Sequence, residues 1–152
     1  MADSRGPRTA MGEAMRRLAR TDLTRAELES ALADKFATEE IAAALDQLES
    51  KGWLSDARVI ARDTERAALN RHQGRLRLAQ RLVRRGLETE DAFAVAQSLD
   101  EESEVSKATR LLQGKAYEAT EWSKAAGFLA RRGFDEETIR SALAAVFPTY
   151  EG

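Results

Sequence analysis

A pattern of apolar and charged residues occurs three times along the 152-residue chain, and it constrains the fold more than any other feature. Each copy has two apolar residues four positions apart, then a cationic stretch, an apolar residue, an acidic stretch and three apolar residues at helical spacing. The first two apolar residues are Leu28 and Leu32, Leu78 and Leu82, and Ala125 and Leu129. Because such self-similarity is typical of repeat proteins, the pattern predicts three tandem units of about 45 residues.

The charged residues inside each copy are typical of one helix ending and the next beginning. Cations at a helix C-terminus and carboxylates in the next first turn both complement the helix dipole. Gly86 and Gly133 suit the left-handed position that ends a helix. Thr38, Thr89 and Asp135 are expected to cap the helices that follow. The first copy has no such glycine and is one residue shorter, so we expect a different turn there.

Another helical stretch precedes each of these helix pairs, at residues 12–20, 56–69 and 102–117. Ala, Leu, Glu and Arg, which are strong helix formers, dominate the chain. Thr24 and Glu27 have the spacing of a capping box that opens a helix. The sequence therefore predicts an all-α protein with three tandem three-helix repeats, stacked into an elongated, curved rod.

The repeat register also predicts where the units begin and end. Residues 1–10 are mostly small or polar, and we expect a disordered lead-in there. The three repeats are expected at residues 11–54, 55–100 and 101–152. The acidic stretch at the start of the third repeat is the expected seam between units.

The formal net charge of −2 conceals an uneven distribution of charge along the chain. Residues 58–86 carry nine arginines, opposed only by Asp63 and Glu65, and their net charge is +7. The flanking segments 21–54 and 100–152 have net charges of −5 and −3. A basic block between acidic flanks indicates an anionic partner or a charged protein surface.

The arginines of this block form stripes on two successive predicted helices, each opposite an apolar stripe. The planar guanidinium group suits bidentate binding of phosphate or carboxylate. The alternative is a solvated face that only keeps the protein soluble, although a net charge of +7 within 29 residues exceeds what solubility requires. The candidate partner-binding residues are Arg58, Arg62, Arg66, Arg71, Arg75, Arg77, Arg81 and Arg84.

Other functional classes find little support in the sequence. There is no cysteine, and His72, the single histidine, is expected in a surface turn without a metal. No nucleotide-binding or hydrolase motif occurs, so we expect no catalytic residues and no cofactor. Trp53 and Trp122 are expected in the core, Trp53 between the first two repeats, and a stacking surface is the less favoured alternative for both. Without a membrane span or signal peptide, we expect a soluble, cytoplasmic monomer that does not bind membranes.

Several motifs, in order and at consistent spacing over residues 12–147, resemble the RecX family of regulatory proteins. They are Leu23-Thr24-Arg25-Ala26-Glu27-Leu28, then Ile41, Leu45 and Leu48, then Gly52-Trp53-Leu54-Ser55-Asp56-Ala57-Arg58, then Gly74, Leu78, Leu82 and Arg84-Arg85-Gly86-Leu87, and finally Phe128-Leu129, Gly133-Phe134 and Ile139. Three features depart from the family pattern, and one is the missing glycine near Lys35-Phe36 in the first repeat. Val59-Ile60 replaces the usual aromatic residue, and Asp63 replaces an apolar residue one turn later.

The resemblance implies a modulator of the RecA recombinase, built from three three-helix repeats without a catalytic centre or cofactor. Members of this family bind the RecA filament on single-stranded DNA and limit its growth. They suppress its ATP hydrolysis, strand exchange and coprotease activity. The residues alone leave two alternatives open. One is a helical module that binds single- or double-stranded DNA without RecA, and the other is an adaptor whose basic face meets an unrelated acidic protein.

Overall fold

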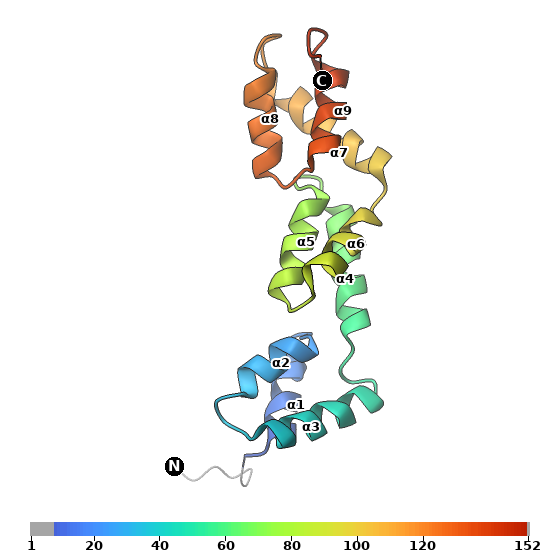
Figure 1. Cartoon of the computed structure of the whole chain (residues 1–152). Coiled ribbons are helices and arrows are strands. Elements are labelled where there is room, and N and C mark those ends of the chain that lie inside the picture. The colour runs from blue at the N-terminus through green and yellow to red at the C-terminus, as the bar shows by residue number, and fades with distance from the viewer. Residues whose placement is uncertain (1–7, 152) are drawn as a thin grey trace. The chain divides into compact units, whose positions relative to one another are not determined.

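The computed structural model describes residues 8–151, and this part of the chain contains nine helices and no strand (Figure 1). The all-α prediction is therefore confirmed, and in chain order the helices form three groups of three. They are α1 (Ala10–Arg20), α2 (Arg25–Leu32), α3 (Thr38–Ser50), α4 (Asp56–Leu69), α5 (Arg75–Arg84), α6 (Thr89–Gln97), α7 (Glu101–Lys115), α8 (Trp122–Arg131) and α9 (Glu136–Val146).

The chain divides into two compact units, and the boundary falls inside α4, between Ala61 and Arg62. It does not fall at the acidic stretch 100–104, where the sequence predicted a seam. The helices of the second and third groups, from Arg62 onward, belong to one unit, because the acidic stretch supplies buried ion pairs that join them, as described below. The repeat boundaries at 11–54, 55–100 and 101–152 stay a prediction.

The start of α1 differs from the lead-in expected over residues 1–10. Residues 1–7 of that segment lie outside the described part of the chain. Thr9 caps α1, since its hydroxyl oxygen accepts a hydrogen bond of 3.0 Å from the backbone N–H of Gly12. Ala10 is fully buried against the other helices of the first unit. The ordered chain therefore begins before residue 11.

Two of the four predicted N-caps are confirmed. Thr24 and Glu27 form a complete capping box, and the Asp135 carboxylate accepts a hydrogen bond from the backbone N–H of Thr138. The prediction was wrong for Thr38 and Thr89, which are the first residues of α3 and α6 and make no capping bond. Carboxylates in the first turn of both helices complement the helix dipole there instead.

The helix C-termini follow the predicted pattern. Gly86 and Gly133 have φ values of 106° and 87°, the left-handed conformation that glycine adopts most easily. After α2 the chain stays right-handed at Ala33, and the backbone N–H of Phe36 bonds to Leu32 O at 3.2 Å. The first copy of the pattern therefore turns without a glycine, as predicted.

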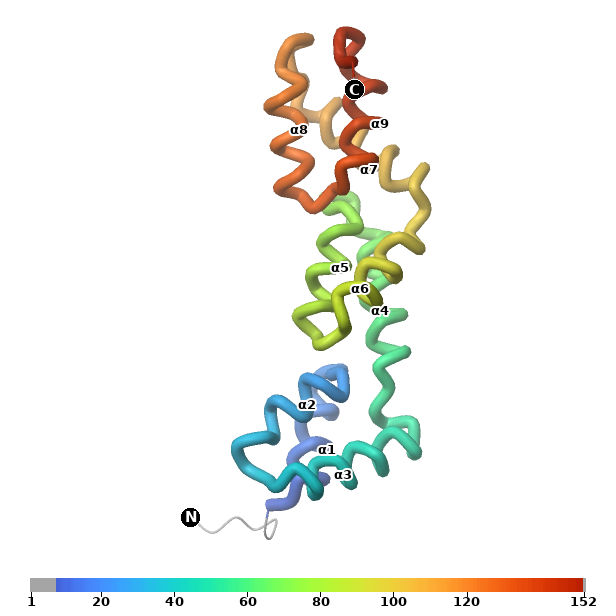
Figure 2. Tube along the Cα trace, viewed as in Figure 1, coloured from blue at the N-terminus to red at the C-terminus, as the bar shows by residue number. Residues whose placement is uncertain are grey.

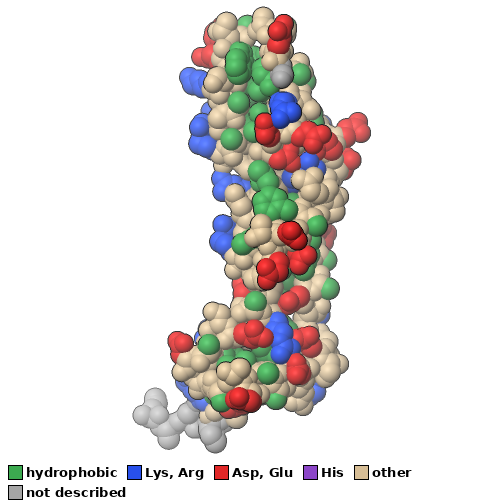
Figure 3. Space-filling view, in the orientation of Figure 1, with side chains coloured by type: hydrophobic (Ala, Val, Ile, Leu, Met, Phe, Trp, Pro, Cys, Tyr) green, Lys and Arg blue, Asp and Glu red, His purple; other side chains and the backbone are tan. Residues whose placement is uncertain are grey.

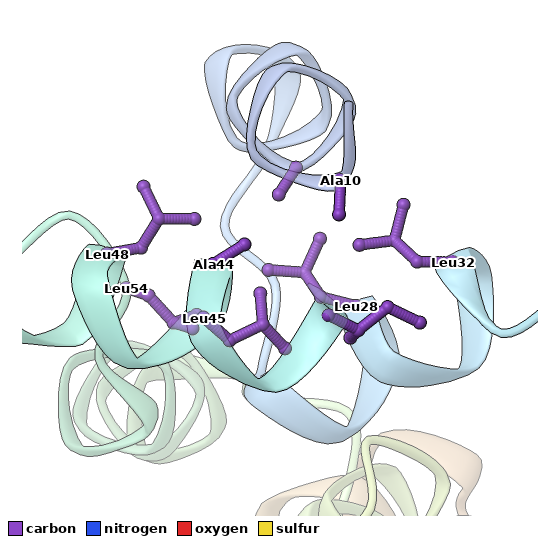
Figure 4. Close-up of a cluster of buried hydrophobic side chains, with 9 residues drawn as sticks. Ala10, Leu28, Leu32, Ala44, Leu45, Leu48 and Leu54 are labelled. Carbon is purple, nitrogen blue, oxygen red and sulfur yellow. The ribbon is translucent and has the colours of Figure 1, made fainter. Parts of the chain in front are cut away.

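Each unit has an apolar core. In the first unit, leucines of α2 and α3 pack under the small residues of α1, among them Ala10, and Leu54 closes the cluster after α3 (Figure 4). The core of the last three helices centres on Phe134, Phe147 and Leu129. The tryptophan prediction was wrong, because Trp53 is 50% exposed and Trp122 is 42% exposed. Leu54 takes the core position beside Trp53.

Within residues 8–151, no helix is long and apolar enough to cross a membrane. The same part of the chain contains no group of three or more His, Cys, Asp or Glu residues arranged to hold a metal ion. His72 lies exposed in the turn after α4, where its backbone N–H bonds to the Asn70 side chain, as expected for a surface residue.

Candidate partner-binding surface

The structure exposes seven of the eight arginines that the sequence singled out. Arg58 belongs to the first compact unit, and the others belong to the second. The exposed candidates in the second unit are Arg62, Arg66, Arg71, Arg77, Arg81 and Arg84. We call these six residues the arginine surface.

The arginine surface includes a hollow between α4 and α5. Arg66 of α4 and Arg77 and Arg81 of α5 line it, together with the polar side chains of Asn70 and Gln73. The two predicted stripes therefore meet at one place in the fold. Guanidinium groups that converge from two helices provide several donors for a single anionic group.

Most of these arginines are available for a partner. Arg66, Arg71, Arg81 and Arg84 make no ion pair or side-chain hydrogen bond within the described part of the chain. Arg77 differs, because its guanidinium donates to the backbone carbonyl of Arg131. A partner that binds the four available side chains would not have to break internal bonds first.

Basic residues of α8 extend this surface beyond the segment that the sequence singled out. The contact between Arg77 and Arg131 joins the end of α8 to the start of α5, and the Arg131 side chain is itself exposed. Figure 3 shows basic side chains along the edge formed by α5 and α8. The signal was present in the sequence, since Arg131-Arg132 occupies the same place in the repeat as Arg84-Arg85.

Arg75 lies inside the second unit, and it is the one candidate that the structure removes from the surface. Only 3% of the residue is exposed. Its guanidinium donates to Asp135 Oδ2 at 2.6 Å, to Leu99 O at 3.1 Å and to the Glu101 carboxylate. Its backbone N–H donates to Glu104 Oε1 at 2.7 Å. All these partners come from residues 99–135, so Arg75 joins α5 to α7 and α9.

The turns that precede α5 and α9 lie against one another (Figure 2). Gly74 N donates to Arg132 O and Leu76 N donates to Gly133 O, both at 2.9 Å. A Cβ atom at Gly74 would lie 2.6 Å from Gly133 O and from the Cα atom of Phe134. Only glycine therefore permits this approach.

Lys107 of α7 lies on the other side of the joint, our name for the contacts of α5 with α7 and with the turn before α9. Its ammonium group lies 2.6 Å from the buried Glu104 carboxylate. It also donates to the backbone carbonyls of Ala67, Asn70 and Gln73 at 3.2–3.3 Å. Carbonyls at a helix C-terminus carry partial negative charge, so Lys107 both caps α4 and neutralises Glu104. Two carboxylates of the acidic stretch, Glu101 and Glu104, are thus paired with cations inside the second unit.

The charge states within the joint follow from these contacts. Burial raises the pKa of Asp135. The hydrogen bond from the Thr138 backbone and the Arg75 guanidinium lower it by more, so the pKa lies below its ordinary value. Burial lowers the pKa of Arg75, whereas Asp135, Glu101 and Glu104 raise it, and the net effect is an increase. The ion pair between Arg75 and Asp135 therefore persists well below neutral pH.

Asp63, which replaces an apolar residue of the family pattern, is 3% exposed in α4. Its Oδ2 atom lies 2.8 Å from Nε of Arg85, which follows α5. Val59, another departure, is also buried and supplies apolar packing. The charged residue is therefore accommodated because the end of α5 provides a cation for it. This pairing also removes Arg85 from the available arginines.

The comparisons with known proteins agree with one another. A regulatory protein RecX of Chromohalobacter salexigens is 35% identical to this chain over 143 residues, which cover 90% of this chain and 91% of that protein. This chain belongs to the RecX family. The RecX protein of Acidithiobacillus ferrooxidans is 35% identical over 146 residues, covering 95% of this chain and 94% of that protein. No family model matches the chain.

Solved structures of RecX proteins share the fold. The crystal structure of RecX from Lactobacillus salivarius superposes with a TM-score of 0.78 at 15% identity, covering 90% of this chain and 94% of that one. Another crystal structure of a regulatory protein RecX superposes with a TM-score of 0.71 at 16% identity, covering 85% of this chain and 68% of that one. RecX proteins are regulatory proteins and not enzymes, so the expectation of a non-catalytic protein is confirmed by family membership.

Proposed function

We propose that this chain binds the RecA filament on single-stranded DNA in the cytoplasm and inhibits its ATPase, recombinase and coprotease activities. The observation that carries the proposal is the 35% identity to a regulatory protein RecX over 90% of the chain. The arginine surface supports it, because the guanidinium groups of Arg66, Arg71, Arg81 and Arg84 are unpaired within the described residues. Arginine binds carboxylate and phosphate groups, and a nucleoprotein filament presents both.

Arg81 and Arg84 provide the sharpest test of this surface. Both are exposed and unpaired within the described chain, so their replacement by glutamine removes charge without breaking an internal contact. The matched control replaces Arg20 and Arg110 by glutamine. These residues are also exposed and unpaired within residues 8–151, and Arg20, like Arg84, is the last residue of its helix.

The measurement is RecA ATP hydrolysis on single-stranded DNA, titrated with each purified variant. We expect the wild-type chain and the control to inhibit hydrolysis. The Arg81→Gln and Arg84→Gln double variant should need roughly thirty times more protein, because each lost charged contact at an interface costs of order 1 kcal/mol and two of them cost about 2 kcal/mol. A wild-type chain that leaves hydrolysis unchanged at several-fold excess would refute the function. Equal inhibition by both double variants would place the contact elsewhere.

The second candidate function is DNA binding without RecA. It is favoured by the four arginines that are unpaired in the described chain, which suit a phosphate backbone. The acidic segments on either side of the arginines disfavour it. Binding to DNA alone would then be tight, with an affinity that falls steeply with salt because each phosphate contact releases a counterion. Negligible DNA affinity at moderate salt, with binding to the filament retained, would exclude this candidate.

A further inference from the structure

Trp53 lies on the surface of the first unit, outside its apolar core. Gly52 has a φ of 75°, and the backbone N–H groups of Trp53 and Leu54 both bond to Leu48 O, at 3.0 and 3.3 Å. This is the hydrogen-bonded turn that ends many helices. Leu54 is 2% exposed and fills the core, whereas Trp53 is 50% exposed. The turn therefore places Trp53 on the side where a partner can reach its indole group.

The indole borders an apolar hollow between α1 and the end of α3. Its other apolar walls are Met15, Leu18 and Ala19 of α1 and Leu48 of α3. Met15 is itself 42% exposed. Large apolar side chains that are exposed together are typical of interaction sites, and tryptophan and methionine are each enriched there.

Two cations flank the hollow. The ammonium group of Lys51 lies 4.9 Å from the centroid of the Trp53 ring. The Arg58 guanidinium donates to Gly52 O at 3.0 Å and to Trp53 O at 3.2 Å, so it is fixed beside the same turn. Asp22 is the only acidic residue that lines the hollow within the described chain. The site is thus apolar inside and mainly cationic at its edge.

We propose that this hollow, which we call the Trp53 hollow, receives an apolar side chain flanked by carboxylates on the surface of a protein partner. The proposal rests on the proposed function, in which that partner is a RecA protomer of the filament. The aliphatic walls suit an inserted side chain, and Lys51 and Arg58 suit the neighbouring carboxylates. A nucleic acid strand is the alternative occupant, and the quenching experiment with single-stranded DNA distinguishes it from a protein partner.

The test compares two tryptophans of similar exposure in different units. Trp53→Ala removes one wall of the hollow. Trp122→Ala is the control, since Trp122 is 42% exposed and its ring is tilted against that of Tyr150. Far-ultraviolet circular dichroism checks that both variants fold. We expect Trp53→Ala to weaken binding to RecA filaments on single-stranded DNA by at least about tenfold, the usual effect of losing a tryptophan hot spot. Trp122→Ala should bind within about twofold of wild type.

A reporter measurement makes the test independent of any loss of stability. The reporter is a Trp122→Phe chain in which 5-hydroxytryptophan replaces Trp53. This label can be excited at wavelengths that the tryptophans of RecA do not absorb, so acrylamide quenching of its fluorescence reports the accessibility of position 53 alone. Adding filament should reduce the quenching severalfold. Adding single-stranded DNA without RecA, or raising the concentration of the chain, should leave it unchanged.

Each other outcome overturns the inference in a recognisable way. Protection by DNA alone would mean that a base stacks on Trp53, and protection at high chain concentration would mean that a second copy covers the hollow. If the wild-type chain binds and inhibits the filament while Trp53 stays accessible, this inference fails and the proposed function stands. If the wild-type chain does not bind the filament at all, the proposed function fails first and the inference with it.

Discussion

Replacing Gly74 with alanine is expected to open the joint between α5 and the turn before α9. Gly74 adopts extended backbone angles that alanine tolerates, with φ of −90° and ψ of 170°, so the substitution acts only through space. The new methyl group would lie 2.6 Å from Gly133 O and from the Cα atom of Phe134, about 0.8 Å closer than the 3.4 Å at which ordinary contact begins. Both neighbours are backbone atoms, which cannot rotate away.

The magnitude follows from what must move. A shift of about 0.8 Å lengthens the bonds from Gly74 N and Leu76 N, now 2.9 Å each, beyond the usual hydrogen-bond range. Two such bonds contribute about 1 kcal/mol each. Overpacking in a buried site adds about 1–3 kcal/mol. We therefore expect the free energy of unfolding of the second unit to fall by about 3–5 kcal/mol.

Urea unfolding measures this loss, with circular dichroism for the whole chain and Trp122 fluorescence, in a Trp53→Phe background, for the second unit. The midpoint of the unfolding transition that Trp122 fluorescence reports should fall by about 1–2 M urea. Gly114→Ala is the control, because nothing lies within 4 Å of a Cβ at that position in α7. It should raise stability by up to about 1 kcal/mol. A Gly74→Ala chain as stable as wild type would show that this close approach does not hold the joint together.

The remaining predictions concern buried charges in the second unit. Arg85→Ala leaves the Asp63 carboxylate buried without its cation and should lower the free energy of unfolding by roughly 3 kcal/mol, most of which Asp63→Leu in the same chain should restore. A double variant no more stable than Arg85→Ala would contradict this account. The pKa of Asp135 is lower in the folded chain than in the unfolded chain. Its ionised form therefore stabilises the fold at pH values above the unfolded-state pKa of about 4, and this stabilisation is lost as the pH falls through the folded-state pKa. The stability difference between wild type and Asp135→Asn should therefore shrink between about pH 6 and pH 3, and a constant difference in urea titrations at both pH values would argue against it.

The candidate surface was partly predictable from the sequence. Helical spacing alone placed Arg66, Arg81 and Arg84 on solvent-facing stripes, because their apolar neighbours must face the core. The same reasoning failed for Arg75, which is the first residue of α5 and whose carboxylate partner Asp135 is 60 positions away. It also failed for Trp53, because the turn after Gly52 directs Leu54 and not the indole into the core.

The sequence by itself determined the helices, most of their ends and their threefold repetition, because apolar spacing, capping and the glycines at residues 86 and 133 act within a few residues of the chain. Only the tertiary structure decided which charges serve the fold and which are available to a partner. Arg75 and Lys107 bind carboxylates and carbonyls that the fold brings to them from distant positions, whereas Arg81 and Arg84 meet none within the described residues. A charge becomes internal when folding removes it from water and supplies a counter-charge, and the residue type does not reveal that.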